Sequence, residues 1–379
     1  MSVLRKAAAD HGIRLNRLDG AGNLSAGIMR KNKVMRHYKG LMVKYNAGEE
    51  QLIGYHADFG GRIELIQQGF DEGGVINKYD EKSSYPHKCI KLPSMAGGFW
   101  VKREYGEFDW TDIENASPVS MFQVRWGLPE RYIDAHGNMQ VIPFFALPYR
   151  LEGGGIRFFS RGLGWYFQDE IMFLKRWLER FAELGACINP DGSPYRLSKA
   201  EADRLGALDK FYLADLIEAR LFYPVNDERP FAFVPEAFEK RKLINEEYKR
   251  TGQYNIGEKV IKLELNGISG KVAQSIGGSE TKPPRCYNIF YAGAIRAGTR
   301  RSIGEAALQA PHETVQFCTD ATFSKVPLVL NEGDELGQWE LEKVNDLLTV
   351  QSGVYSYLKG EKIDNKTRGF AAGNGAAMG

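Results

Sequence analysis

Apolar residues recur at helical spacing in three segments of the chain. Residues 168–185 carry them three and four positions apart and end at a glycine, which predicts a helix. Residues 235–253 form a charged amphipathic pattern that opens with proline, a residue suited to the first turn of a helix. A third helical pattern, 257–278, follows after a short connection between Gly252 and Gly257. The last two segments therefore predict a helical hairpin.

Strand-like patterns fill much of the remaining sequence. A basic helix is expected at 22–37, and the stretch from there to residue 80 is rich in strand patterns. Short helices are expected at 84–91 and from residue 197. Between 98 and 165 the chain is aromatic and punctuated by glycine, with the strand-like runs FWVKREY, SMFQVRW and VIPFFALPYRL. The chain thus predicts mixed helix and sheet.

Composition excludes several classes of protein. The 379 residues are 43% hydrophobic and 12% aromatic, so the chain can bury a sizeable core and is not disordered. Its four cysteines lie far apart without a CxxC pair, which argues against structural zinc or a disulfide framework and suits a reducing cytoplasm. The start lacks the apolar core of a signal peptide, and no apolar run reaches the roughly 18 residues of a membrane span.

Positive charge is concentrated in two stretches, although the net charge is only +2. Residues 1–47 carry ten Lys or Arg against two Asp, and residues 281–304 carry five Lys or Arg with no acidic residue. Basic patches beside an acidic site suit a bound polyanion. Solvated helix faces are the alternative interpretation of both stretches.

Three short strings carry the candidate chemistry. YDEKSSYP, 79–86, places Asp80 at the end of an apolar-flanked strand, and CTDATF, 318–323, places Asp320 directly after an apolar run. KLELNGISGK, 262–271, places Lys262 on a helix. Carboxylates at strand ends far apart in sequence meet only if their strands are neighbours in one sheet. Two such carboxylates with a lysine nearby suit a site for divalent metals and a triphosphate, whereas Asp80 taken alone is better interpreted as an ordinary turn residue after a strand.

The order and spacing of these strings resemble motifs A, B and C of family B DNA polymerases, closest to the phage and plasmid type with protein-primed members. The string DFGGRIE, 58–64, resembles the YxGG stretch of that group, and the resemblance covers roughly residues 50–370. It implies an α+β fold: a palm built on an antiparallel sheet with packed helices, helical-hairpin fingers and an α/β insertion.

The resemblance also implies a division of the chain. Residues 1–100 hold the basic N-terminal segment and the first part of the palm with motif A, and 101–230 form an insertion of unknown role. Residues 231–278 are the fingers with motif B, and 279–379 are the second part of the palm with motif C and a C-terminal tail. Neither the exonuclease nor the thumb of the family is expected, because too few residues precede YxGG or follow motif C.

The resemblance assigns the catalytic role to Asp80 and Asp320. With the backbone carbonyl of Glu81 they are the expected ligands of two Mg²⁺ ions, for which Mn²⁺ can substitute. Nucleotide binding falls to Lys262, Arg241, Tyr85, Ser84 and Asn266, and primer–template binding to Gly60, Gly61, Lys366 and Arg368.

Three of these assignments have open alternatives. Tyr85 is expected under the sugar of the incoming nucleotide but is equally a core aromatic residue. Lys240 and Lys242 compete with Arg241 for the triphosphate, and Lys366 and its neighbour Arg368 are equally part of a flexible tail.

The sequence also departs from the family pattern. Ser269 stands where motif B usually has tyrosine, Cys318 and Ala321 replace the first Asp and the Ser of motif C, and Asp58 replaces the tyrosine of YxGG. Two functions follow. The first is a template-directed DNA polymerase core of a virus or mobile element, in the cytoplasm without a membrane, acting on primer-template DNA and dNTPs, with a terminal protein as a further partner. The second is a non-catalytic or split polymerase subunit that binds nucleic acid and needs a second polymerase chain.

Overall fold

A computed structural model describes residues 6, 8, 9, 12, 13, 21–38, 48–188, 214–274 and 284–367. The helix expected from residue 197 and the residue Arg368 lie outside these ranges. Within them, no helix combines the length and the apolar character needed to cross a bilayer.

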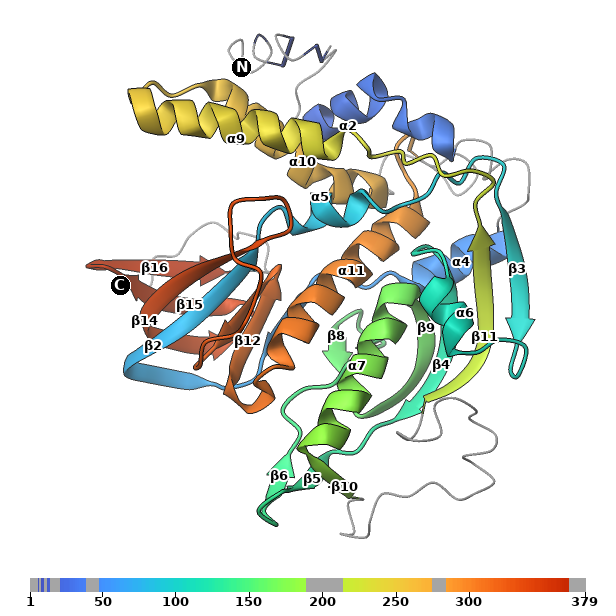
Figure 1. Cartoon of the computed structure of the whole chain (residues 1–379), viewed down its shortest axis with the longest axis vertical. Coiled ribbons are helices and arrows are strands. Elements are labelled where there is room, and N and C mark those ends of the chain that lie inside the picture. Colours follow the sequence, from blue (N-terminus) through green and yellow to red (C-terminus); the bar gives the residue numbers. More distant parts are fainter. Residues whose placement is uncertain are drawn as a thin grey trace.

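The largest sheet has seven antiparallel strands in the order β1-β12-β13-β2-β14-β15-β16. Their bounds are β1 Arg62–Leu65, β2 Gly69–Glu81, β12 Thr314–Thr319, β13 Ala321–Ser324, β14 Trp339–Gln351, β15 Val354–Lys359 and β16 Lys362–Thr367. The strings of motifs A and C lie on its central strands: β2 ends in one, and the β12–β13 hairpin contains the other. We call this sheet the palm sheet (Figure 1).

Helices α9 (Val234–Thr251) and α10 (Ile256–Ala273) form the expected hairpin above the palm sheet (Figure 1). Gly252 ends α9 with φ +70°, a conformation that glycine adopts without steric cost. Asn255 caps α10, since its side chain accepts a hydrogen bond of 2.8 Å from the Gly257 N–H. Helix α2 (Ala21–Lys31) packs along α10, and the 3₁₀ helix η1 (Val34–His37) follows it.

Helix α11 (Ile289–Ala307) runs through the middle of the molecule, between the palm sheet and the segment that follows motif A (Figure 1). It contacts α4 (Gly48–Ala57), α5 (Ser84–Cys89), α7 (Gln168–Leu184) and α10. Two of its glycines allow the close approach of Phe167, the last residue of β9, and of Phe173 on α7. A Cβ on Gly293 would lie 2.0 Å from the Phe167 ring, and a Cβ on Gly304 would lie 2.3 Å from the Phe173 ring. Any larger residue there would force the two helices apart.

The segment between motifs A and B contributes a four-stranded antiparallel sheet in the order β3-β11-β4-β9 and two smaller sheets. The bounds are β3 Phe99–Glu104, α6 Trp110–Asn115, β4 Met121–Gly127, β5 Arg131–Asp134, β6 Met139–Val141, β7 Pro148–Arg150, β8 Ile156–Phe158, β9 Arg161–Phe167, β10 Gly185–Ile188, β11 Ala214–Tyr223 and, later in the chain, η3 Pro311–Glu313. Phe122 and Trp177 of this segment lie in one buried cluster with Tyr79 and Phe317 of the palm sheet. The two parts therefore share a core.

The α+β fold and the helical hairpin are confirmed, and three local expectations are wrong. The basic helix stops at Lys31 because Lys33 takes the left-handed conformation with φ 55°. The supposedly strand-rich stretch contains α4, whose Gly54 packs against Phe290 of α11. Of the run VIPFFALPYRL, 141–151, only Val141, the last residue of β6, and Pro148–Arg150 lie in strands.

Candidate active site

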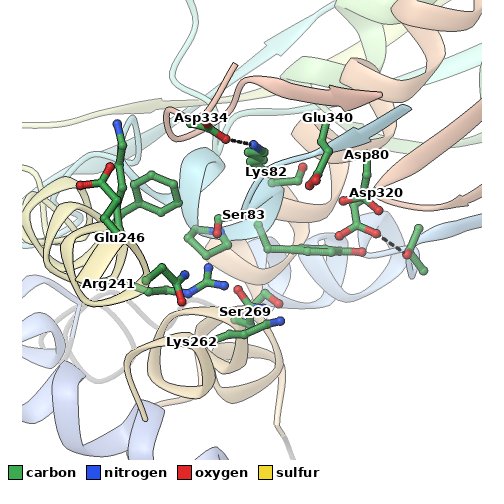
Figure 2. A pocket seen from close by; sticks show the side chains of 18 of the residues that line it. Asp80, Lys82, Ser83, Arg241, Glu246, Lys262, Ser269, Asp320, Asp334 and Glu340 are labelled. Atoms are coloured by element: carbon green, nitrogen blue, oxygen red, sulfur yellow. Dashed lines mark hydrogen bonds and ion pairs between the residues drawn. The ribbon is translucent and has the colours of Figure 1, made fainter. Parts of the chain in front are cut away.

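A cavity of about 620 Å³ opens between the end of β2, the β12–β13 turn, α5 and the α9–α10 hairpin. Most of the residues named from the three strings line it (Figure 2). The lining consists of Asp80, Lys82, Ser83, Ser84, Tyr85, Pro86, Phe238, Arg241, Lys242, Asn245, Glu246, Lys249, Lys262, Asn266, Ser269, Thr319, Asp320, Asp334 and Glu340. None of these residues is Cys or His, so the site offers oxygen and cationic groups.

The two aspartates come from neighbouring strands, as predicted. Ala321 is the direct partner of Asp80 in the β13–β2 pair, and Asp320 precedes Ala321 in the turn. The Glu81 N–H donates a 3.0 Å hydrogen bond to the Asp320 carbonyl, which fastens the turn to the end of β2. Figure 2 shows the side chains of Asp80 and Asp320 side by side at one wall of the cavity.

Glu340 is a third carboxylate at this wall, and sequence reasoning missed it. It lies directly opposite Asp80 in the β14–β2 pair, so both side chains project from the same face of the palm sheet. Figure 2 shows Glu340 beside Asp80 and Asp320. The only signal in the sequence is that Glu340 ends the string LGQWE, 336–340, which does not reveal the strand register.

Thr319 presents Asp320 from a strained turn. Its φ is 61°, an unusual value for a β-branched residue. The Thr319 hydroxyl lies 2.7 Å from Asp320 Oδ1, drawn as a dashed line in Figure 2, and 2.7 Å from the Cys318 carbonyl oxygen, so two acceptors share its single proton. Strain of this kind concentrates at functional sites. The turn thus holds the carboxylate of Asp320 in one orientation.

The opposite wall is basic and is formed by the hairpin. Lys262, Asn266 and Ser269 are spaced four and three residues apart on α10, so they share one face of that helix, and all three line the cavity. Arg241 reaches the same wall from α9. Its Nε also donates a 2.7 Å hydrogen bond to Glu258 Oε1, so part of the guanidinium is already engaged.

Tyr85 and Ser84, on α5, form the floor between the two walls. The Ser84 hydroxyl donates to Glu81 Oε2 at 2.6 Å, which turns it toward the palm interior. Gly61 lies against Tyr85: a Cβ at Gly61 would be 2.8 Å from the Tyr85 hydroxyl and 3.3 Å from Thr319 Cγ2. A side chain at position 61 would therefore displace Tyr85.

Glu81 does not line the cavity. Its side chain is buried, 2% exposed, and accepts hydrogen bonds from Ser84, His87 and Lys88. Burial opposes ionisation of Glu81, but its donors His87, Lys88 and Ser84 outweigh burial and hold its pKa below the usual value. The Glu81 carboxylate thus links the end of β2 to α5 behind the cavity.

Three of the expected primer–template residues, Gly60, Gly61 and Lys366, do not line the cavity, although Gly61 contacts its lining residues Tyr85 and Thr319. Gly60 accepts a hydrogen bond from Arg300 through its carbonyl, and Lys366 pairs with Asp364 at 2.8 Å on β16, the edge strand of the palm sheet.

The expectation of a basic surface over residues 281–304 is wrong for three of its arginines. Arg296 pairs with Asp58 at 2.6 Å, Arg300 pairs with the buried Glu170 at 2.7 Å, and Arg301 pairs with Asp169 at 3.0 Å. These three arginines are engaged in ion pairs that hold α11 against its neighbours.

Comparisons with known proteins agree with this architecture. No family model matches the chain. The DNA polymerase of Acidianus bottle-shaped virus (isolate Italy/Pozzuoli) is 31% identical over 129 residues, which are 34% of this chain and 18% of that protein. The fold is that of a DNA polymerase, and the resemblance indicated by the three strings is confirmed.

Among solved structures, the fold is similar to that of phi29 DNA polymerase. Its orthorhombic crystal form matches 97% of this chain and 63% of that chain with a TM-score of 0.59 and 14% identity. Its complex with primer-template DNA and incoming nucleotides matches 96% of this chain and 62% of that chain with a TM-score of 0.55 and 14% identity. The chain therefore spans less than two thirds of the phi29 enzyme and about a fifth of the viral relative.

Proposed function

We propose that this chain is a DNA-directed DNA polymerase core that adds deoxynucleotides to a primer 3′ hydroxyl. The observation that carries the proposal is the division of one cavity into two walls of opposite charge. Asp80, Asp320 and Glu340 form the acidic wall, and Lys262 and Arg241 face them from the hairpin. A nucleoside triphosphate with its metal ions needs both kinds of wall within one cavity.

The acidic wall suits divalent metal ions of the magnesium type. Its donors are carboxylate oxygens, and among the described residues no three His, Cys, Asp or Glu side chains gather into a complete metal-binding cluster. Mg²⁺ commonly binds through one or two carboxylates and takes its remaining ligands from substrate phosphates and water. We assign Asp80 and Asp320 to two Mg²⁺ ions, or to Mn²⁺ in their place; the Glu81 carbonyl, expected as a further ligand, belongs to a residue that does not line the cavity. Bound there, the ions would activate the primer hydroxyl and neutralise the leaving pyrophosphate.

The hairpin residues would bind the nucleotide itself. Lys262 meets the triphosphate as a point charge, and the guanidinium of Arg241 can use its remaining N–H groups for the same phosphates. Asn266, one turn further along α10, faces the nucleotide, and Tyr85 excludes a 2′-hydroxyl beneath the sugar. Ser84 positions Tyr85 from the preceding residue of α5 through its bond to Glu81.

Primer-template DNA and deoxynucleotides are the proposed partners. We assign primer–template contact to Gly60 and Gly61, because Gly61 lies between Tyr85 and Thr319 at the cavity. We assign contact with the duplex beyond the cavity to Lys366 of β16 and to Arg368, which lies outside the described residues.

Primer extension tests the proposal. The full chain, a short primer-template, Mg²⁺ and deoxynucleotides should give an extended primer, and Asp80→Asn and Asp320→Asn should each abolish it. Asp71→Asn, at an aspartate on the distant end of β2, is the matched control and should leave extension intact. Equal extension by Asp80→Asn and the wild type would refute the assignment.

A second candidate function is favoured by Cys318 and Ala321 in motif C. It is a non-catalytic or split polymerase subunit that requires a partner chain or a terminal protein. Such a subunit would bind primer-template DNA with steep salt dependence yet would not extend it alone.

A further inference from the structure

The loop between β13 and β14 carries two adjacent carboxylates, Asp334 and Glu335, and is fastened to the palm. The Lys82 N–H donates to the Gln338 carbonyl at 2.8 Å, and the Gly337 N–H donates to the Lys82 carbonyl at 3.0 Å. The Glu335 N–H donates to Gln338 Oε1 at 2.8 Å. The backbone of this loop is therefore held in place directly after β2, next to Asp80.

Both carboxylates reach lysines of the cavity. Asp334 forms an ion pair with Lys82, shown as a dashed line in Figure 2, and Glu335 forms an ion pair with Lys242 of α9. Lys82 and Lys242 both line the cavity. The second pair joins the fingers helix to the palm loop, through two residues that are 93 positions apart in sequence.

The neighbouring lysines favour the ionised form of both carboxyl groups. Lys82 lowers the pKa of Asp334, with smaller contributions from Lys249 and Lys242. Lys242 likewise lowers the pKa of Glu335.

These pairs are also easily exchanged. The side chains of Asp334 and Glu335 are 78% and 54% exposed, and exposed ion pairs contribute little to stability. A more highly charged anion that enters the cavity would compete with them for the same lysines.

We infer that Asp334 and Glu335 are an internal competitor for phosphate, holding Lys82 and Lys242 until a triphosphate displaces them. The inference rests on the proposed function and adds a control of nucleotide affinity to it. Displacement of Glu335 also frees α9 from the palm loop, so occupancy of the cavity and the position of α9 are linked. Glu239 and Glu246, the acidic neighbours of Lys242 on α9 itself, move with that helix and stay beside the lysine.

Binding of inorganic tripolyphosphate tests the inference without DNA or catalysis. Calorimetric titration of the full chain with magnesium tripolyphosphate should show about tenfold tighter binding for the double variant Asp334→Asn, Glu335→Gln, because two competing charges close to the lysines are removed. Glu332→Gln neutralises a carboxylate of the same loop for which no described lysine partner exists, and it should bind like the wild type. Thermal unfolding of each variant checks that the fold is kept.

A double-mutant cycle distinguishes a specific Glu335–Lys242 ion pair from a general effect of negative charge near the cavity. Glu335→Gln should tighten binding in the wild type and have no effect in a Lys242→Ala background. Three outcomes would overturn the inference. They are unchanged affinity in the Asp334→Asn, Glu335→Gln double variant, absence of binding in both the wild type and that variant, and an equal gain in affinity from Glu332→Gln. If tripolyphosphate binding responds as expected but no primer is ever extended, the loop's role stands and the polymerase function falls. If primers are extended but binding does not respond, the polymerase function stands and the loop's role falls.

Discussion

Asp80 and Glu340 are direct cross-strand partners at the ends of β2 and β14. Two carboxylates on one face of an antiparallel pair repel each other unless a cation lies close to both. Under the proposed function, a metal ion bound at the acidic wall would relieve this repulsion between the two strands of the palm sheet.

We expect Glu340→Gln to raise the Mg²⁺ concentration needed for half-maximal primer extension by roughly tenfold, the lower end of the effect of losing a group that supports a metal site. The measurement is a Mg²⁺ titration of extension rate. Glu342→Gln is the control, because Glu342 lies on the same strand but pairs with Lys78 and Lys359. The same midpoint for Glu340→Gln and the wild type would remove Glu340 from the metal site.

Lys262→Ala should weaken nucleotide use more than primer-template binding. Loss of a charge-assisted contact to phosphate costs about 1.5–3 kcal/mol, a tenfold to hundredfold change in the nucleotide KM or in kcat/KM. The control is Lys259→Ala, a lysine of the same helix that does not line the cavity. Unaltered KM and kcat in Lys262→Ala would refute the role.

Tyr85→Ala and Tyr85→Val should raise ribonucleotide incorporation relative to deoxyribonucleotide. Overlap of an oxygen with a packed ring costs about 1–3 kcal/mol, which corresponds to roughly 5- to 150-fold discrimination. Asp80→Asn should abolish incorporation of both sugars. An unchanged ratio in an active Tyr85→Ala enzyme would make Tyr85 a core aromatic residue.

Thr319→Gly tests the backbone strain at position 319 separately from the orientation of the Asp320 carboxylate. Glycine adopts the positive φ of this position freely, so the free energy of unfolding should rise by about 1 kcal/mol at most or stay the same. Extension rate should nevertheless fall by about tenfold, because Asp320 loses the hydroxyl that orients it. Thr319→Asn tolerates the same backbone and supplies a polar group, so its rate should lie between the two. Full activity of the glycine variant would show that the hydroxyl does not matter.

Glu264, on the α9–α10 hairpin, should make the stability of the folded chain depend on pH. It lies on α10 with 2% exposure, and its Oε1 has no hydrogen-bond partner among the residues that the structure describes. Burial raises its pKa to about 7, against the opposing attraction of Lys31 and Lys240. The carboxyl group therefore holds a proton in the folded chain between about pH 4.5 and 7 that the unfolded chain has lost.

Stability should accordingly fall as pH rises through this window, because the folded state binds more protons than the unfolded state. Glu264→Gln should raise the free energy of unfolding by roughly 2–4 kcal/mol at pH 8 and by much less at pH 4.5. Urea unfolding at both pH values measures the difference. The same gain at both would mean that Glu264 is not protonated by folding.

The cavity residues that sequence could find are those carried by local strings. Asp80, Lys262 and Asp320 each follow a recognisable pattern, and the apolar runs before both aspartates predicted neighbouring strands. The hairpin was predictable because glycine and proline mark its helix ends.

The residues that sequence could not find depend on long-range packing. The alternation of a strand shows which residues share a face but not which strand lies opposite, so Glu340 could not be paired with Asp80. Likewise the charge of Arg300 and Arg301 suggested a surface, because the partners Glu170 and Asp169 are about 130 residues away.

The shared core described above limits how this architecture can be dissected. Tyr79, the residue just before Asp80, is fully buried in the same cluster as Phe122 and Trp177 from the segment between motifs A and B. That segment is thus a structural wall behind the strand that carries Asp80, rather than an appendage. Removing this segment, or replacing it with that of another polymerase, would leave one side of β2 without a packing partner. The smallest part of the chain that can fold in this way therefore includes the segment.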